Sequence, residues 1–370
     1  MTTTTIEARE ELRASLREFL ADRAPLSAVR RHVDLDEPLD RKLWEALARD
    51  IGVQGLAIAE AEGGAGAGWA ETAVAFEETG RGLTPVPLLA TIGLALPAVL
   101  AAGDDDVRAE VLPRIASGEV VATLGWIGED GDWNGAGDAV RAVRDGGQWR
   151  LSGALGFVLD GQSADILLVV AATDAGPSLF LVDGDDGLVR TPQPTLDQTR
   201  RLSVISFDGT AARLVGTDGG AAAVLADVLD RARVLLAAEM LGGAQACLDM
   251  SVTYAKGREQ FGRPIGSFQA IKHKCAETLV QVEQARAGVE AAALALNEEP
   301  ERVAVLAPLV KAYVGDAFFR AAAENIQIHG GIGFTWEHDA HLYFKRAKSS
   351  DLLLGDAAAH RAILADRLGL

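Results

Sequence analysis

Residues 254–277 read YAKGREQFGRPIGSFQAIKHKCAE, and this stretch decides how the rest of the chain is interpreted. Its Gly-Arg-Pro-Ile-Gly turn closes one long helical pattern and opens the next. Arg258 lies at the end of the first helix, where a guanidinium can give a two-pronged, charge-assisted contact to a phosphate, and Phe261 just beyond it presents an apolar face to a ring. Taken alone, such an arginine is more often a partner in a surface ion pair.

A second stretch, residues 325–350, reads NIQIHGGIGFTWEHDAHLYFKRAKSS and places a Gly-Gly-x-Gly directly after an apolar helix. Glycines there would let a nucleotide approach the backbone closely, and Gln327 could bond its polar edge. The competing interpretation is a helix C-cap followed by a turn, which by itself is the stronger one. Neither stretch alone therefore establishes a nucleotide site.

Helical periodicity surrounds both stretches. From about residue 219, one helical face collects Leu225, Val228, Leu229, Ala232, Leu235, Leu236 and Met240. Further long helices fit residues 267–296 and 301–328. Together these patterns predict a bundle of long helices.

Short β-type segments fill the chain before that bundle. They include VVATLGW, QWRLSG, DILLVVAA, SLFLV and RLSVISF, separated by clusters of Gly, Asp and Pro. Because no long helical stretch lies between them, we expect an antiparallel sheet or barrel.

The first part of the chain is helical in pattern again. Its glycine-rich AEGGAGAG, residues 61–68, is interpreted as a loop, because no strand precedes it and no Lys-Ser/Thr pair follows. The predicted fold class is therefore α+β in several parts: an N-terminal helical domain at 1–117, a middle antiparallel β domain at 118–218 and a C-terminal four-helix-bundle-like domain at 219–370.

Bulk properties exclude several classes of function. The 370 residues carry a formal net charge of -18, which would repel a nucleic-acid backbone, so an anionic ligand would depend on local arginines and backbone N–H groups. Cys247 and Cys275 are the only cysteines and do not form a secretory disulfide framework. No signal-peptide pattern is visible, and the longest apolar stretch, residues 87–102, is interrupted by Pro97. We expect a cytoplasmic protein that does not bind nucleic acid or cross a membrane.

Together, the two stretches resemble matching places in the C-terminal domain of the acyl-CoA dehydrogenase family. The resemblance covers the whole chain: the helix, sheet, helix order, LPRIASGE before the sheet, LDQTRRL at 196–202, the turn at 258–269 and QIHGGIG. It implies the fold of that family, FAD as cofactor, an acyl-CoA thioester as substrate and an electron-transferring flavoprotein as electron acceptor. A dimer at least, and usually a tetramer, is implied as well.

The resemblance also implies which residues bind FAD. In that family the matching residues typically reach the FAD of the neighbouring subunit, around its pyrophosphate and adenosine. The predicted cofactor-binding set is Arg258, Gln260, Phe261, Gln269, Gln327, Gly330 and Gly331.

Three histidines, His329, His338 and His341, lie close together and near acidic residues. Imidazoles and carboxylates are the right donors for a zinc ion. The resembled family uses no metal here, however, so we expect hydrogen-bonded or solvated histidines and no metal site.

The chain departs from the family at the catalytic base. Family members remove a proton next to the thioester with a carboxylate, usually a Glu just before a Gly-Thr. Counting without gaps places Leu354 there, followed by Gly355 and Asp356, and the alternative position used by some members falls on Ala232. We therefore predict no catalytic base in this chain, although four acidic residues lie near these positions without occupying them: Asp230, Glu239, Asp351 and Asp356.

Two further departures concern the flavin ring. A Thr-Glu-Pro-x-x-Gly-Ser-type stretch normally cups the ring, whereas this chain reads ATLGWIGEDGDWNG at 122–135, and GFVLDG at 156–161 is a weak match to the stretch that covers it. Asp356 replaces the family's Thr, and its charge would repel a pyrophosphate. All these departures fall on the half-site that a subunit supplies to its own flavin, while the matches fall on the half-site supplied to a neighbour.

We therefore expect one subunit of a mixed assembly, in which a partner of the same fold carries the base and the flavin-ring pocket. The pattern resembles the base-lacking subunit of the α2β2 acyl-CoA dehydrogenases of actinobacterial steroid side-chain breakdown. A bulky, steroid-like CoA thioester is the substrate that this resemblance implies.

Three alternatives stay open. A self-sufficient homotetramer could use a relocated carboxylate such as Glu239, Asp351 or Asp356. A flavin-dependent monooxygenase of the same fold would need no α-proton base. A non-catalytic scaffold subunit would bind no cofactor at all.

Overall fold

Long helices flank the Gly-Arg-Pro-Ile-Gly turn, as the periodicity predicts. The computed structural model describes residues 3–133, 135 and 137–370. In it, α7 spans Ala221–Gly257, α8 spans Gln269–Glu298 and α9 spans Pro300–His329. Both helices predicted after the turn are confirmed to within a turn at each end. Although α7 runs over 37 residues, no helix in the described part of the chain is long and apolar enough to cross a membrane.

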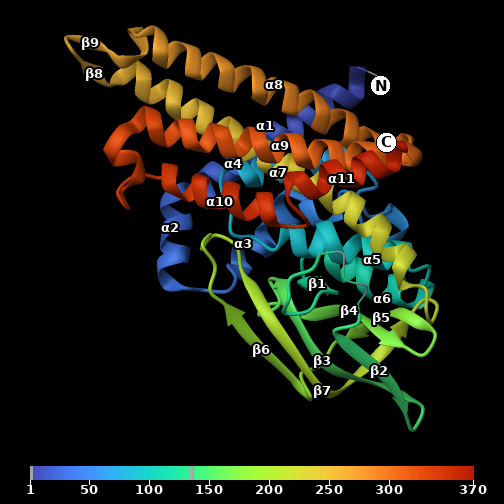
Figure 1. The fold of residues 1–370 in the computed structure, drawn as a ribbon. Coiled ribbons are helices and arrows are strands. Elements are labelled where there is room, and N and C mark those ends of the chain that lie inside the picture. Colours follow the sequence, from blue (N-terminus) through green and yellow to red (C-terminus); the bar gives the residue numbers. More distant parts are fainter. Residues whose placement is uncertain (1–2, 134, 136) are drawn as a thin grey trace. The chain divides into compact units, whose positions relative to one another are not determined.

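By their contacts the residues form two compact units, which we describe separately. The first comprises the residues up to Arg31, Trp69–Thr84 and Arg233–Leu370. Besides most of α7, it contains α1 (Thr3–Arg23), α4 (Trp69–Arg81), α8, α9, α10 (Ala340–Leu352) and α11 (Ala357–Leu368). Its central helix is α9, because α8, α10 and α11 all pack along it (Figure 1).

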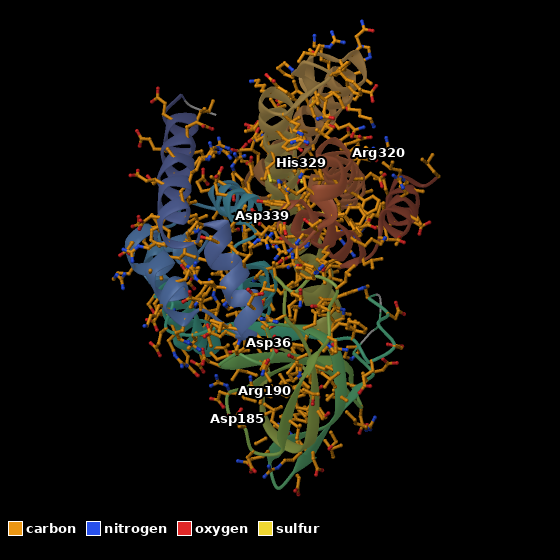
Figure 2. The ribbon with its side chains drawn as sticks, turned by 90° about the vertical axis from the view of Figure 1, so that its left-hand side faces the viewer. Asp36, Asp185, Arg190, Arg320, His329 and Asp339 are labelled. Atoms are coloured by element: carbon orange, nitrogen blue, oxygen red, sulfur yellow. The ribbon has the colours of Figure 1, made fainter. Side chains whose placement is uncertain are left out.

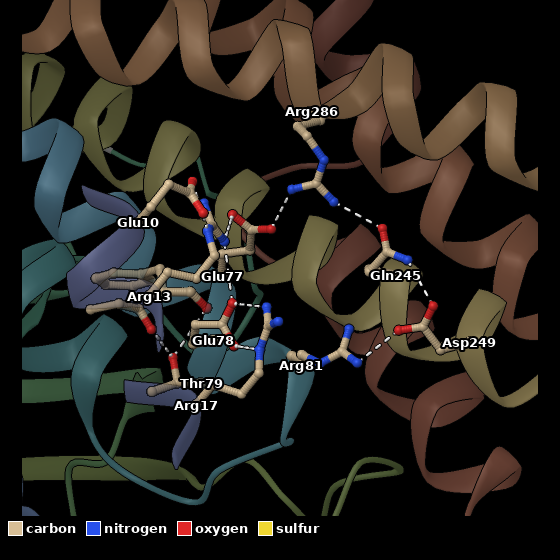
Figure 3. A network of polar contacts seen from close by, with 12 residues as sticks. Glu10, Arg13, Arg17, Glu77, Glu78, Thr79, Arg81, Gln245, Asp249 and Arg286 are labelled. Carbon is tan, nitrogen blue, oxygen red and sulfur yellow. Dashed lines mark hydrogen bonds and ion pairs between the residues drawn. The ribbon is translucent and has the colours of Figure 1, made fainter. Parts of the chain in front are cut away.

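Ion pairs bind three helices of this first unit together (Figure 3). Glu78 on α4 is 3% exposed and accepts hydrogen bonds from Arg17 on α1 at 2.7 and 3.0 Å, and from Arg13 at 3.2 Å. Its neighbour Glu77 pairs with Arg13 at 2.7 Å and with Arg286 on α8 at 2.6 Å. The contacts of α1 and α8 with α4 are therefore partly electrostatic.

The second unit, His32–Gly68 and Pro85–Ala232, carries the sheet. Its strands are β1 (Ala122–Gly125), β2 (Val140–Asp145), β3 (Gln148–Leu159), β4 (Ile166–Thr173), β5 (Gly176–Val182), β6 (Leu188–Gln193) and β7 (Leu202–Val215). Its helices are α3 (Arg41–Ala46), α5 (Leu96–Ala101) and α6 (Asp105–Ala116), with short π- and 3-10 turns between them, and α2 (Leu26–Leu35) runs from the first unit into it.

Five strands close into a ring in the order β4, β2, β3, β7 and β5, since β5 pairs with both β7 and β4. Most pairings are antiparallel, as predicted. The prediction is wrong for β4, which pairs in parallel with β1 and with β2. The β2–β3 hairpin lies between β1 and β4 in the chain, so β4 enters the sheet in the same direction as β1. Parallel strands buried on both faces read as continuous apolar runs, which suits the segment Ile166–Ala172.

The order of helices, strands and helices predicted from sequence is confirmed. The boundaries expected at 117/118 and 218/219 stay a prediction, since the compact units interleave segments that are distant in the chain.

Candidate cofactor-binding site

A two-residue hairpin follows α7. Its strands β8 (Glu259–Gln260) and β9 (Arg263–Pro264) are joined by Phe261 and Gly262, whose φ angles are 55° and 75°. Two positive φ angles are what the favoured two-residue hairpin turn requires. Glycine adopts them freely, whereas for a residue with a Cβ the left-handed region costs about 1–2 kcal/mol. The turn thus holds Phe261 in a strained conformation with its side chain 92% exposed.

Local contacts brace this hairpin. The Ile265 N–H donates to the Arg258 carbonyl oxygen at 2.8 Å, which closes its base. The ring of Phe268, just before α8, meets that of Phe261 edge-on, with 6.2 Å between ring centroids. The guanidinium of Arg263 lies over the same Phe268 ring, 4.1 Å from the ring centroid.

The hairpin presents free positive charge. Within the described residues, neither Arg258 nor Arg263 forms an ion pair or a side-chain hydrogen bond, whereas most other arginines pair with carboxylates. Both are exposed. Arg263 was not singled out from the sequence. The signal that could have found it is the Phe-Gly turn, which places it directly across from Gln260.

The second predicted stretch leaves open space at its glycines. Gly330 ends α9 with a φ of 64°, and a Cβ added there or at Gly331 would meet nothing within 4 Å. Gln327, on the last turn of α9, and Gln269, on the first turn of α8, are exposed. Nothing from the described part of this chain fills the space at the two glycines.

Stacked rings connect the two stretches. The Arg258 N–H donates to the carbonyl oxygen of Tyr254, on α7, at 2.8 Å. The ring of Tyr254 lies against His329, the last residue of α9, with ring centroids 4.2 Å apart. Since Gly330 follows His329, the structure brings the Arg258 and Gly330 segments to the same end of the first unit.

The histidines predicted not to bind a metal contact other rings. His329 stacks on His338 at 4.2 Å, and its Nδ1 lies 2.8 Å from the Asn325 carbonyl oxygen. His341 lies against Trp336 at 4.6 Å, and burial, aided by Lys345, lowers its pKa to about 4. Within the described residues, no three potential metal-ligating side chains come together.

The two positions that the resemblance assigns to a catalytic base carry apolar side chains. Leu354 is 1% exposed and has a φ of 62°, and Ala232 is buried. The loop around Leu354 is held by Lys311, whose Nζ donates to the carbonyl oxygens of Asp351 at 3.1 Å and Gly355 at 3.0 Å. Neither position can accept a proton.

Three of the displaced carboxylates have other partners. Glu239 accepts a hydrogen bond from buried Arg346 at 2.9 Å. Asp351 pairs with Lys348 at 2.9 Å, and Asp356 accepts the Ala359 N–H at 2.8 Å as the N-cap of α11. Each of these three carboxylates therefore takes part in an ion pair or a helix cap.

Aromatic side chains occupy the stretch expected to cup a flavin ring. Trp126, 2% exposed, packs against Trp133 with centroids 5.7 Å apart, and Trp133 packs against Phe157 at 6.4 Å. Trp126 Nε1 donates to the Trp133 carbonyl oxygen at 3.3 Å. Asn134 of this stretch lies outside the described residues. The sequence showed that the family pattern was missing, but not that these rings pack on one another.

Comparison with known proteins places this geometry in context. The family model for the acyl-CoA dehydrogenase N-terminal domain matches residues 6–119, and that for the C-terminal domain matches residues 218–369. The chain is 36% identical to the acyl-CoA dehydrogenase IpdE2 of Mycolicibacterium smegmatis, covering 94% of this chain and 95% of that protein. Among solved structures it is 33% identical to a chain of a variant of the Tcur3481–Tcur3483 steroid ACAD (TM-score 0.88, covering 99% and 98%). It is 29% identical to a chain of the ChsE4–ChsE5 complex from Mycobacterium tuberculosis (TM-score 0.89, covering 100% and 98%).

Proposed function

This chain belongs to the acyl-CoA dehydrogenase family, and we propose that it is the subunit of a mixed assembly that lacks the base and completes the FAD site of a partner with the same fold. Members of the family are FAD-dependent oxidoreductases acting on the CH–CH bond of an acyl-CoA thioester. The observation that carries the proposal is an exposed hairpin whose Arg258 and Arg263 have no ion-pair partner among the described residues, in a chain with Leu354 at the position that the resemblance assigns to the base.

The residues on the neighbour-facing side fit an FAD. Arg258 is free to contact the diphosphate with charge-assisted hydrogen bonds. The open space at Gly330 and Gly331 would let a nucleotide approach the backbone, and Gln269 and Gln327 can bond its polar edges. FAD, when bound, accepts the hydride from the substrate. The part of this chain is then to hold and orient the adenosine and diphosphate end.

The residues of the half-site that this chain would supply to a flavin of its own do not fit FAD. Trp126 and Trp133, in the stretch that would cup the ring, pack on each other, and Trp133 also packs on Phe157 in the stretch that would cover it. Leu354 offers no proton acceptor. In our proposal, the ring pocket and the carboxylate base therefore belong to the partner subunit.

The substrate proposed is a bulky, steroid-derived CoA thioester. The support is indirect: one similar structure is described as a steroid ACAD, and another is a complex of two differently named proteins. Loss of the ring pocket in one subunit would leave room for a large acyl group. An electron-transferring flavoprotein is the proposed electron acceptor.

The homotetramer alternative needs a relocated base. Glu239 is engaged by Arg346 deep in the first unit, Asp351 pairs with Lys348, and Asp356 caps a helix. Using any of the three as a base would weaken these contacts, which disfavours this alternative.

Co-expression tests the proposal. The chain should be colourless when purified alone and should form a yellow, FAD-containing heterotetramer with a homologous partner, as read by visible absorption and native mass. The pair should oxidise a steroid-CoA thioester faster than a short straight-chain acyl-CoA.

Arg258→Ala should release FAD from the pair while the heterotetramer of subunits stays assembled. Arg320→Ala, an exposed arginine on α9 without an ion pair in the described chain, is the matched control. A yellow homotetramer of this chain alone that oxidises an acyl-CoA would show the proposal to be wrong.

A further inference from the structure

Arg263 lies next to a predicted cofactor ligand. It is directly opposite Gln260 in the β8–β9 hairpin, and directly opposite residues of an antiparallel pair project their side chains from the same face. Whatever approaches Gln260 on that face also approaches Arg263. The hairpin therefore carries two arginines, Arg258 and Arg263, on either side of its turn.

Arg263 makes a contact that does not use its hydrogen-bond donors. Its guanidinium carbon lies over the ring of Phe268, 4.1 Å from the ring centroid, which is the distance of a cation–π interaction. Its N–H groups form no ion pair or side-chain hydrogen bond among the described residues. In a chain of net charge -18, an arginine ordered in this way is prepared for an anion from outside.

Phe268 connects this cation to the turn. Its ring also meets Phe261 edge-on, with 6.2 Å between the ring centroids, so Arg263, Phe268 and Phe261 form one contiguous cluster. A ligand that pairs with Arg263 would find an exposed aromatic ring beside it. A nucleotide diphosphate, with negative charge next to flat rings, matches that arrangement.

We propose that Arg263 is a second diphosphate-binding residue of the half-site, ordered by Phe268 and acting together with Arg258 on the FAD held by the partner subunit. The inference rests on the proposed function and adds a residue to it. Because the contact with Phe268 orders the guanidinium in advance, little side-chain freedom is lost on binding.

The test follows FAD release from the purified holo-assembly after dilution, read by the recovery of flavin fluorescence at several salt concentrations. A charge-assisted hydrogen bond of about 1.5–3 kcal/mol implies that Arg263→Ala weakens FAD binding by roughly tenfold to a hundredfold. The salt dependence should become shallower, because one cation is missing. Arg263→Lys keeps the charge and should lose less, whereas Phe268→Leu keeps the arginine but not its platform and should fall between wild type and Arg263→Ala.

Arg320→Ala is the control for removal of an exposed, unpaired arginine of the described chain and should release FAD at the wild-type rate; Arg320 is labelled in Figure 2. If Arg258→Ala weakens FAD binding but Arg263→Ala behaves like Arg320→Ala, the inference is wrong and the proposed function stands. If the pair never contains FAD, the proposed function itself fails. Equal loss of thermal stability in Arg263→Ala and Arg263→Lys, with an unchanged salt dependence, would show a purely structural role and overturn the inference.

Discussion

The side chain of Phe261 is almost wholly exposed, at a φ that phenylalanine disfavours. Strain of this kind persists where the surrounding structure imposes it, and it concentrates at functional sites. Phe261→Asn should raise the free energy of unfolding by about 1 kcal/mol, because asparagine tolerates the left-handed region. The same change should lower FAD retention in the pair, because the ring is lost. Denaturant unfolding and flavin content measure the two effects.

Phe261→Leu is the control that separates the effect on stability from the effect on FAD retention. Leucine keeps the strained Cβ and loses only the aromatic ring, so FAD retention should fall without a gain in stability. If Phe261→Asn left the unfolding free energy unchanged or lowered it, the strain argument would be wrong.

The buried amine of Lys311 should make the free energy of unfolding depend on pH in an unusual way. Burial lowers the pKa of its amine to about 8, although the carboxylate of Asp351 acts in the opposite direction. Between about pH 8 and the ordinary lysine pKa of roughly 10.5, the unfolded chain binds a proton that the folded chain does not. Stability contributed by this group should therefore rise with pH across that window, by about 3 kcal/mol. An uncharged amine can still donate to the carbonyl oxygens of Asp351 and Gly355.

Lys311→Met isolates the effect, because methionine has no proton to lose. Urea unfolding at both ends of that pH window should show the wild type gaining stability relative to this variant. Burial raises the pKa values of Tyr343 and Cys247 in the folded chain, so these groups titrate in the window only when the chain is unfolded; they are common to both proteins and cancel in the comparison. Parallel pH profiles would contradict the prediction.

At the scale of elements, the ion pairs between α1, α4 and α8 invite a direct test. Glu78→Gln should lower the unfolding free energy by about 2–3 kcal/mol, because a buried pair that loses one partner leaves a guanidinium poorly compensated. Arg17 is partly exposed, which holds the cost below that of a fully buried pair. Thermal or urea unfolding measures it.

Glu10→Gln is the matched change for this network. Glu10 pairs with Arg13 at 3.5 Å but is largely exposed, so its loss should cost less than about 0.5 kcal/mol. Equal effects of Glu78→Gln and Glu10→Gln would mean that burial does not decide the strength of these pairs.

The elements also show where sequence patterns fall short. Helices α8 and α9 were placed to within a turn, because their apolar spacing and the flanking Gly and Pro residues act locally. The parallel pairing of β4 was missed, because a strand's direction depends on the β2–β3 hairpin that separates it from β1. An apolar run such as Ile166–Ala172 is compatible with either direction.

At the scale of the whole molecule, the proposal predicts the flavin content. One half-site of this chain has residues that fit FAD, and the other does not. If the proposed function is right, an assembly of this chain with its partner should contain half as many flavins as subunits, because in that proposal only the partner provides a ring pocket. Flavin absorbance per mole of native assembly, with subunits quantified separately, measures this ratio. A flavin for every subunit would show that the packed Trp126, Trp133 and Phe157 rings do not exclude the cofactor.

The amino-acid sequence was enough to indicate the family and the order of helices and strands, because these are carried by local periodicity and by short motifs such as REQFGRPIGSFQ and QIHGGIG. Only the folded structure shows that the rings of Tyr254 and His329 contact each other and so join the two motifs, and that Arg263 lies over the ring of Phe268. Spacing along a chain fixes which face of an element a residue occupies. Which ring or charge meets that face depends on how elements distant in the sequence pack, and this is settled only when the chain folds.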